Sequence, residues 1–167
     1  MTPASPHKTA LATVGSTAPF PGLIEACLSR PVLATLSQLG YTELRLQHGS
    51  AELPPVVVFP HLRITDFAFA PSLSPEITKA DLIISHAGAG TILEALRMGK
   101  RLVIVPNQAL MDNHQLELAE ELDRLGYCVC GTVKLVVNTC FSHFRPPNTH
   151  THTHACIHTY IITQDLS

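Results

Sequence analysis

The sequence predicts an α/β fold in which a parallel β-sheet is flanked by helices. Between residues 81 and 131, short apolar runs alternate with segments of helical periodicity. The predicted elements are a strand at 81–85, a helix at 90–99, a strand at 101–106, a helix at 112–126 and a strand at 127–131. Strand–helix–strand units with short links place their strands in parallel. The runs at 81–85 and 101–106 are continuously apolar, which is typical of strands buried on both faces.

The composition favours one domain with a packed core. The chain has 167 residues, and 46% of them are hydrophobic. The net charge is −2 without a cluster of Lys and Arg, so we expect no nucleic-acid partner. No apolar run approaches the roughly 20 residues that span a bilayer, so we expect no direct transmembrane anchor. The five cysteines are odd in number and scattered, which favours a reducing, cytoplasmic compartment.

Shorter elements are predicted before the alternating region. They are a strand at 11–14, a helical segment at 20–40, strands at 42–49 and 63–70, and a short helix at 74–80. Pro31 is expected to break or kink the helical segment near Arg30, and Gly40 is expected to end it. In the short helix we expect Ser74 to be the N-cap and Pro75 to take the first helical position.

The last helix and strand of the alternating region have distinct patterns. The helix is predicted to be amphipathic, with acidic residues on one side and an apolar side formed by Leu116, Ala119, Leu122 and Leu125. After the helix, Cys128 and Cys130 lie in an apolar run with one residue between them. We interpret them as buried thiols of a strand rather than as metal ligands.

Residues 133–167 differ in composition from the rest of the chain. Half of the histidines lie there, and the repeat THTHTH occupies 149–154. On a strand this repeat would place three imidazoles on one face, where they could bind a transition metal. An AC dinucleotide repeat also encodes alternating Thr and His, so we favour translated non-coding or frameshifted sequence that packs poorly. Transcript sequencing that shows an uninterrupted spliced reading frame to the last residue would contradict this hypothesis.

The segment HAGAGT, residues 86–91, lies where the strand at 81–85 meets the next helix. We expect Gly88 and Gly90 to allow positive φ angles and the close approach of a ligand. The first amides of the helix would carry the positive end of its dipole, which suits a phosphate. The third glycine of a dinucleotide fingerprint is missing, and no Gly-Lys-Ser/Thr completes a P-loop. A tight turn without a ligand is the alternative.

Glu94 has two interpretations. With Thr91 it fits a capping box, in which Thr91 is the N-cap of the helix and Glu94 reaches back to it. Alternatively, the carboxylate of Glu94 accepts hydrogen bonds from both hydroxyls of a ribose beside the phosphate. Only the second interpretation gives Glu94 a role in binding.

Two more strand-to-helix junctions carry polar residues at the same edge of the predicted sheet. The first, TVGST, contains Gly15, Ser16 and Thr17. The second, after the strand at 101–106, contains Asp112, Asn113, His114 and Gln115. Asp112 or Asn113 is expected to cap the helix, and the others could contact sugar hydroxyls or an acetamido group. Because ligands bind at the carboxyl ends of parallel strands, the three polar turns together favour a nucleotide-sugar site.

Four segments together resemble a known family. They are TVGST, GYTELRLQHG, ADLIISHAGAGTILEALRMGKRLVIVPN and LMDNHQLELAEELDRLGY. They resemble the catalytic, donor-binding subunits of eukaryotic dolichol-linked UDP-N-acetylglucosamine transferases. Those subunits are similar to the donor-binding half of the bacterial peptidoglycan N-acetylglucosaminyltransferases, which belong to glycosyltransferase family 28 and have the GT-B architecture. The resemblance implies an N-terminal extension at 1–10, a UDP-sugar-binding Rossmann-like domain at 11–132 and an irregular tail at 133–167.

The resemblance also implies a role for each polar turn. The phosphate and acceptor side would be lined by Gly15, Ser16 and Thr17. The diphosphate region would be held by His86, Gly88, Ala89, Gly90 and Thr91. The ribose would be bound by Glu94. The sugar would be faced by Asn113, His114 and Gln115.

The reaction implied by the resemblance adds a second N-acetylglucosamine to dolichyl-diphosphate-N-acetylglucosamine, with inversion and a β1→4 link. It belongs to the assembly of the N-glycan precursor at the cytosolic face of the endoplasmic reticulum. UDP-N-acetylglucosamine would be the donor, and no cofactor or metal is expected if amides and a helix dipole hold the diphosphate. A membrane-anchored subunit would bind the acceptor and recruit this chain. The general base is not identified, and His86 is a candidate.

The tail departs from the family pattern, in which further helical sequence follows and docks onto the membrane subunit. An alternative function is therefore an inactive or regulatory nucleotide-sugar-binding remnant whose altered C-terminus prevents docking. A dinucleotide-binding oxidoreductase is disfavoured because the third glycine is missing and no acidic residue follows a second strand.

Overall fold

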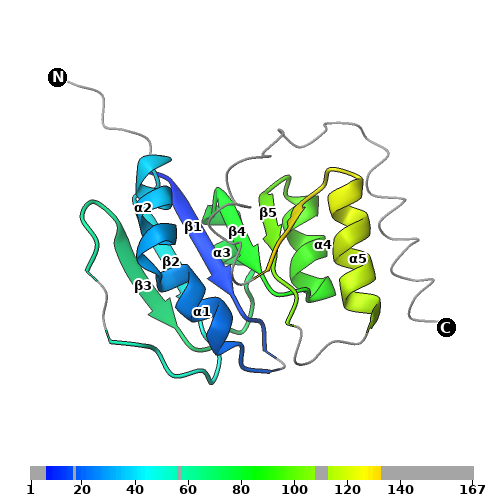
Figure 1. Ribbon diagram of the computed structural model, residues 1–167, viewed down its shortest axis with the longest axis horizontal. Helices are drawn as coiled ribbons and strands as arrows, with labels where there is room; N and C mark the ends of the chain where they lie inside the picture. Colours follow the sequence, from blue (N-terminus) through cyan, green and yellow to red (C-terminus); the bar gives the residue numbers. More distant parts are fainter. Residues whose placement is uncertain (1–6, 17, 56–57, 108–112, 133–167) are drawn as a thin grey trace.

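The computed structural model describes residues 7–16, 18–55, 58–107 and 113–132, and of residues 113–115 it describes the backbone only (Figure 1). Thr17, the predicted tail with its repeat and most of the predicted N-terminal extension lie outside these residues. The strands are β1 (Thr9–Thr13), β2 (Glu43–Gln47), β3 (Arg63–Phe67), β4 (Leu82–Ser85), β5 (Arg101–Ile104) and β6 (Val129–Cys130). The helices are α1 (Pro21–Leu28), α2 (Arg30–Gln38), α3 (Ser74–Lys79), α4 (Ala89–Arg97) and α5 (Asn113–Arg124).

The strands form one parallel sheet in the order β3-β2-β1-β4-β5-β6. From β1 the chain builds outward through β2 and β3, then crosses back to β4 and builds outward on the other side through β5 and β6. The strands β1 and β4 are neighbours, and the chain leaves them in opposite directions, from β1 toward β2 and from β4 toward β5. This switch point is where open α/β sheets form a ligand-binding crevice. The predicted Rossmann-like α/β fold is confirmed.

Helices cover both faces of the sheet (Figure 1). One core contains the buried side chains of α1 and α2 together with Ala10, Ala12 and Val14. The other contains those of α3, α4 and α5 together with Leu11. Because successive strand residues point to opposite faces, both faces of the central strands must be apolar. This requirement explains the continuous runs LIIS in β4 and LVI in β5.

Several element boundaries differ from the prediction. β1 begins at Thr9, two residues before the predicted start, and β6 is limited to two residues. The predicted helical segment is divided at Ser29, whose φ of −65° and ψ of 143° are extended. Pro31 lies in the first turn of α2, where its missing N–H costs no hydrogen bond. The predicted break near Arg30 is therefore confirmed, as a separation of two helices.

Two predictions about helices were wrong. The N-cap of α3 is Leu73, so Ser74 takes the first helical position and Pro75 the second. The hydroxyl of Ser74 donates a hydrogen bond to Glu94 of α4. On α5, Leu118 is buried with Ala119 and Leu122, whereas Leu125 is 44% exposed. The helix ends at Arg124, so Leu125 follows it and does not continue its apolar side.

The two strand thiols lie in the core on the α3–α5 side. Cys128 is buried and precedes β6, Cys130 is partly buried, and neither forms a disulfide. Burial raises the pKa of both thiols, that of Cys130 to about 11, so both are protonated at neutral pH. Cys128 is buried but precedes the strand, and Cys130 lies in the strand but is only partly buried, so the interpretation as buried strand thiols holds in part for each. Within the described ranges, no helix has the length and apolar character that a membrane span requires.

Candidate functional site

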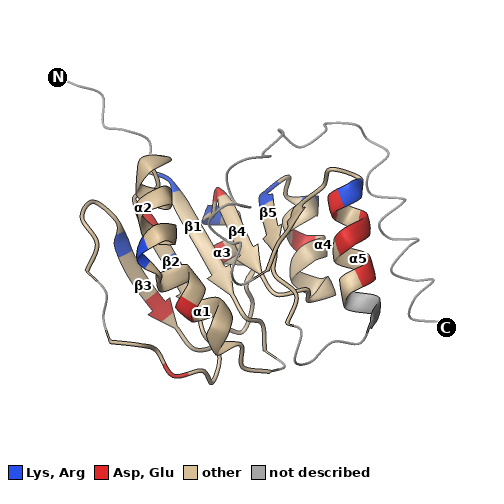
Figure 2. Ribbon diagram, in the orientation of Figure 1, with Lys and Arg blue, Asp and Glu red and all other residues tan. Residues whose placement is uncertain are grey.

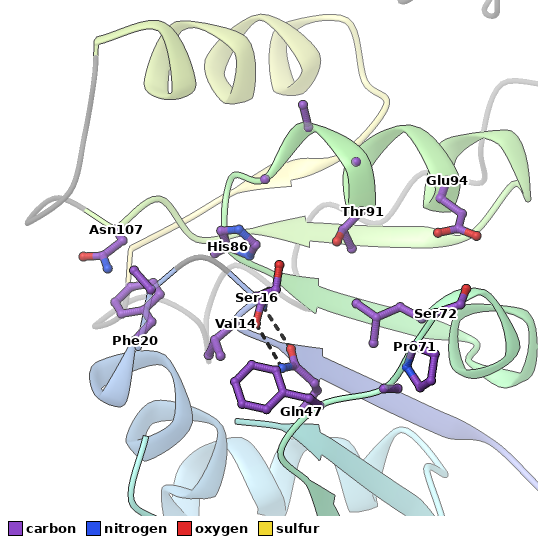
Figure 3. Close-up of a pocket in the computed structure, with 18 residues that line it drawn as sticks. Val14, Ser16, Phe20, Gln47, Pro71, Ser72, His86, Thr91, Glu94 and Asn107 are labelled. Carbon is purple, nitrogen blue, oxygen red and sulfur yellow. Dashed lines mark hydrogen bonds between the residues drawn. The ribbon is translucent and has the colours of Figure 1, made fainter. Parts of the chain in front are cut away.

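A cavity of about 720 Å³ opens at the carboxyl ends of the strands, at the switch point (Figure 3). Five segments contribute to its wall: the ends of β1 and β2, the segment after β3, the β4–α4 turn with α4, and Asn107 after β5. The lining residues are Val14, Gly15, Ser16, Ala18, Phe20, Gln47, Phe69, Ala70, Pro71, Ser72, Leu73, His86, Gly88, Ala89, Gly90, Thr91, Glu94 and Asn107.

The imidazole of His86 is packed between two glycines. A Cβ atom at Gly15 would lie 2.3 Å from Cε1 of His86, and one at Gly88 would lie 2.4 Å from its Nε2. Gly15 also has a φ of +74°, which favours glycine. The φ of Gly88 is −81°, and Gly90 lies within α4, so the expectation of positive φ at these two positions was wrong. At Gly88 it is the imidazole, and not the backbone conformation, that leaves no room for a Cβ atom unless the ring shifts.

The amino terminus of α4 faces the cavity without a side-chain cap. Gly88 is the N-cap residue and makes no side-chain hydrogen bond, while Ala89 and Gly90 are exposed. The first amides of a helix have no partner within the helix, and they carry the positive end of its dipole. The wall of the cavity therefore offers amide donors to an anion. Thr91 lies inside the helix, so the predicted capping box was wrong.

Glu94 is held at the cavity wall from a second helix (Figure 3). The hydroxyl of Ser74 in α3 donates a hydrogen bond to Oε1 of Glu94. This contact leaves Oε2 available to a ligand hydroxyl. Glu94 does not reach back to the start of α4, so the capping interpretation was wrong, and its role as a binding residue stays a prediction.

Gln47 was missed by the sequence analysis. It is the last residue of β2, only 2% exposed, and its amide lies at the floor of the cavity (Figure 3). Its Oε1 accepts hydrogen bonds from Thr13 Oγ1 at 2.6 Å and from the Gly15 amide at 3.0 Å. Its Nε2 donates to the carbonyls of Gly15 at 3.0 Å and Ala68 at 2.8 Å. The amide of Gln47 thus accepts two hydrogen bonds and donates two. These bonds join the end of β1 and the turn after it to the segment after β3.

The imidazole of His86 is neutral at physiological pH. Burial lowers its pKa, and a contact with the Thr13 backbone offsets part of that effect. Nδ1 is buried and has no hydrogen-bond partner among the described residues. Depending on the tautomer, Nδ1 of this uncharged ring could accept or donate one hydrogen bond.

The lining contains one formally charged side chain at neutral pH, that of Glu94, among the residues that the structure describes. An anion in this cavity would therefore be held by backbone amides and the dipole of α4, and not by Lys or Arg. Phe69, at the segment after β3, is 59% exposed although it is a large apolar side chain. An exposed aromatic ring at the wall of a cavity suits the flat face of a base or sugar.

Most of the predicted site residues come together. Those that line the cavity are Gly15, Ser16, His86, Gly88, Ala89, Gly90, Thr91 and Glu94. Thr17 lies outside the described residues, and Asn113, His114 and Gln115 begin α5, with side chains that are not described. The lining residues missed by the sequence analysis include Gln47, Asn107 and the segment 69–73. The segment was missed because residues 69 and 70 were placed within the predicted strand at 63–70, whereas β3 ends at Phe67.

Residues 9–135 match the glycosyltransferase family 28 C-terminal domain. The UDP-N-acetylglucosamine transferase subunit ALG13 of Yarrowia lipolytica is 47% identical over 118 residues, which cover 68% of this chain and 60% of that protein. The Homo sapiens protein of the same name is 46% identical over 128 residues, which cover 74% of this chain. The chain thus spans 60% of the first relative and only 11% of the human one.

Solved structures agree with these relatives. An NMR solution structure of ALG13 superposes with a TM-score of 0.69 at 26% identity, covering 96% of this chain and 98% of that one. The crystal structures of Acinetobacter baumannii MurG and of the glycosyltransferase SnogD from Streptomyces nogalater have TM-scores of 0.56 and 0.63. MurG is 21% identical and SnogD is 20% identical to this chain. Each match covers 98% of this chain, but only 42% of MurG and 41% of SnogD. At these identities the two structures show the fold alone. On the match over residues 9–135, this chain belongs to the glycosyltransferase family 28 C-terminal domain family.

Proposed function

We propose that this chain is the donor-binding subunit of an N-acetylglucosaminyltransferase and that its cavity binds UDP-N-acetylglucosamine. The observation that carries the proposal is the uncapped amino terminus of α4, which faces the cavity beside Glu94 at the switch point of the sheet. Amides and a helix dipole suit a diphosphate, and a carboxylate one turn further along suits the hydroxyls of a ribose. The ALG13 relatives, which are named as UDP-N-acetylglucosamine transferase subunits, support the same ligand.

The nucleotide can be oriented in the cavity from these contacts. The diphosphate lies at the first turn of α4, opposite Gly15, and the ribose hydroxyls bind Oε2 of Glu94. The uracil lies against the segment that contains Phe69, on the β3 side. The N-acetylglucosamine then points toward Asn107 and the start of α5, where Asn113, His114 and Gln115 follow one another in the sequence.

The proposed reaction is an inverting transfer. The 4-hydroxyl oxygen of dolichyl-diphosphate-N-acetylglucosamine attacks C1 of the donor sugar from the side opposite UDP. The bond from C1 to the diphosphate oxygen breaks, and the proton of the hydroxyl passes to a base. The dipole of α4 stabilises the charge that develops on UDP, so the step requires no metal. The base comes from the partner subunit or from the junction, where His86 is a candidate.

The acceptor half of the enzyme is proposed to be a separate, membrane-anchored subunit. A GT-B enzyme works in a cleft between two Rossmann-like halves, and the described residues form one such half. The partner would bind the dolichyl-diphosphate acceptor and recruit this chain to the cytosolic face of the endoplasmic reticulum. The alternative, a nucleotide-sugar-binding remnant that does not dock, is favoured by the departure of residues 133–167 from the family pattern.

Two experiments test these proposals. In calorimetric titration, the chain should bind UDP-N-acetylglucosamine and not NAD; binding of NAD alone would contradict the proposed ligand. Co-expression with the membrane partner should then give a complex that transfers N-acetylglucosamine to a dolichyl-diphosphate acceptor. Donor binding without a complex and without transfer would favour the remnant. A variant chain with a family-like C-terminus, tested beside this one, separates the effect of the tail from that of the domain.

A further inference from the structure

The side-chain amide of Gln47 connects two segments that both line the candidate site. One is the Gly15 turn after β1, which the amide contacts through both the N–H and the carbonyl of Gly15. The other is the segment after β3, which it contacts through the carbonyl of Ala68. Figure 3 shows the hydrogen bonds between Gln47 and the Gly15 turn below the cavity.

The orientation of this amide is fixed by its partners. Two donors, Thr13 Oγ1 and the Gly15 amide, face Oε1, and two carbonyl oxygens face Nε2. If the oxygen and nitrogen of the amide were exchanged, its NH₂ group would face the Gly15 amide, and its oxygen would face the carbonyls of Gly15 and Ala68. The backbone of β2 already pairs with β1 and β3 along its length, so the sheet itself is joined without this side chain. What the amide adds is a link between the two segments beyond the ends of the strands.

We propose that Gln47 is a positioning residue for the donor nucleotide, which holds the diphosphate side and the base side of the cavity at a fixed separation. This inference rests on the proposed function, because UDP is the ligand that would span both sides. Pre-organising the two segments lowers the entropic cost of ordering them when the ligand binds. Gln47 acts through Gly15 and the segment beginning at Ala68 and need not touch the nucleotide.

Replacing Gln47 with Glu provides a test that depends on pH. The substituted side chain has nearly the same shape, and one of its oxygens keeps the two donors. The other oxygen would face the carbonyls of Gly15 and Ala68. As a carboxylate it repels both of them, whereas as a neutral carboxyl its O–H can donate to one. Burial and the two carbonyls raise the pKa of such a carboxyl, so protonation should occur in mildly acidic buffer.

The experiment measures the dissociation constant of UDP for wild type, Gln47→Glu and Gln47→Leu at about pH 8 and about pH 5.5, each divided by the wild-type value at the same pH. We expect Gln47→Glu to bind at least about tenfold more weakly than wild type at the higher pH and to recover most of that loss at the lower pH. Gln47→Leu should be weak at both. Gln38→Glu, the same change at an exposed position on α2, should equal wild type throughout.

The outcomes separate this inference from the proposed function. If wild type does not bind UDP, the proposed function and the inference both fail. If wild type binds UDP but Gln47→Glu matches it at the higher pH, or shows no recovery at the lower pH, the inference alone is overturned. Amide hydrogen exchange gives a ligand-free check on folded variants. The Gly15 amide donates to Oε1 of Gln47 at 3.0 Å and to Thr13 Oγ1 at 3.2 Å. Because Gln47→Leu removes the shorter of these two hydrogen bonds, this amide should exchange faster in the variant than in wild type, while amides within β4 should not change.

Discussion

At the scale of single residues, the imidazole of His86 and its two glycine neighbours form one packing unit. A methyl group at Gly88 would lie 2.4 Å from Nε2 of His86, whereas one at Gly90 would meet no atom of the described residues within 4 Å. We predict that Gly88→Ala lowers the free energy of unfolding by about 1–3 kcal/mol. Gly90→Ala should raise it by about 0.5–1 kcal/mol, because alanine favours the helix. Urea denaturation of both variants checks this, and equal effects would contradict the packing.

The side chain of Glu94 is predicted to hold the ribose. Glu94→Ala should weaken the binding of UDP-N-acetylglucosamine by about 1–3 kcal/mol, because two ribose hydroxyls lose their acceptor. Ser74→Ala, which frees the carboxylate without removing it, should give a smaller loss. Calorimetric titration measures both. Unchanged affinity together with lowered stability in Glu94→Ala would assign the residue a structural role.

The neutral state of His86 predicts a pH dependence of stability. Its folded-state pKa is lowered by burial, so the unfolded chain binds the proton more tightly. The stability that depends on the neutral ring is therefore complete above the unfolded pKa of about 6.5 and is lost as the pH falls toward the folded pKa. Between about pH 7 and about pH 5, unfolding free energy should fall more steeply in wild type than in His86→Asn. Parallel profiles would show that His86 titrates normally.

At the scale of elements, the amino terminus of α4 has opposite requirements for stability and for binding. A carboxylate in the first turn of a helix interacts favourably with its dipole. The same carboxylate would repel a bound diphosphate. Ala89→Asp, at an exposed first-turn position, should therefore raise the unfolding free energy by about 0.3–1 kcal/mol and weaken UDP binding. Thermal melts and titration measure the two effects, with Ala89→Asn as the uncharged control. A gain or no change in affinity would argue against an anion at this helix.

The buried strands were the elements most readily predicted from the sequence. Every residue of β4 is buried, so the apolar run itself indicates a strand covered on both faces. Helix caps were predicted less well because local patterns compete with tertiary contacts. Ser74 fits an N-cap, yet its hydroxyl bonds to Glu94, twenty positions further along the chain. Thr91 fits a capping box, yet the chain enters α4 two residues before it.

The candidate site was predictable only in part, because local patterns identify some of its residues and tertiary contacts determine the others. Gly15, Gly88 and Glu94 belong to short motifs at strand ends, and the sheet topology then brings these motifs together. Gln47 ends an alternating strand and has the polarity of a solvent-facing residue. Its burial depends on the pairing of β2 between β1 and β3, which places two loops around it. No local pattern in the sequence contains that information.

At the scale of the whole molecule, charge is distributed unevenly between the two ends of the sheet. Basic side chains lie at the amino ends of the strands, where Lys8 precedes β1, Lys100 precedes β5 and Arg101 begins β5 (Figure 2). Lys8 and Lys100 donate there to backbone carbonyls at or near the ends of α2 and α3. The described wall of the candidate site, at the opposite end, has no Lys or Arg. The proposed binding of a diphosphate would therefore depend on backbone amides, whose positions are fixed by the fold.

The location of the nucleotide is the central claim, and amide chemical shifts test it most directly. In ¹H–¹⁵N spectra of the chain, UDP-N-acetylglucosamine should shift the amides of Gly15 and of residues 88–91, while those at the amino ends of the strands stay in place. NAD at the same concentration should shift none of them. The absence of shifts at α4, or shifts confined to the edge with Lys100 and Arg101, would contradict the proposed site.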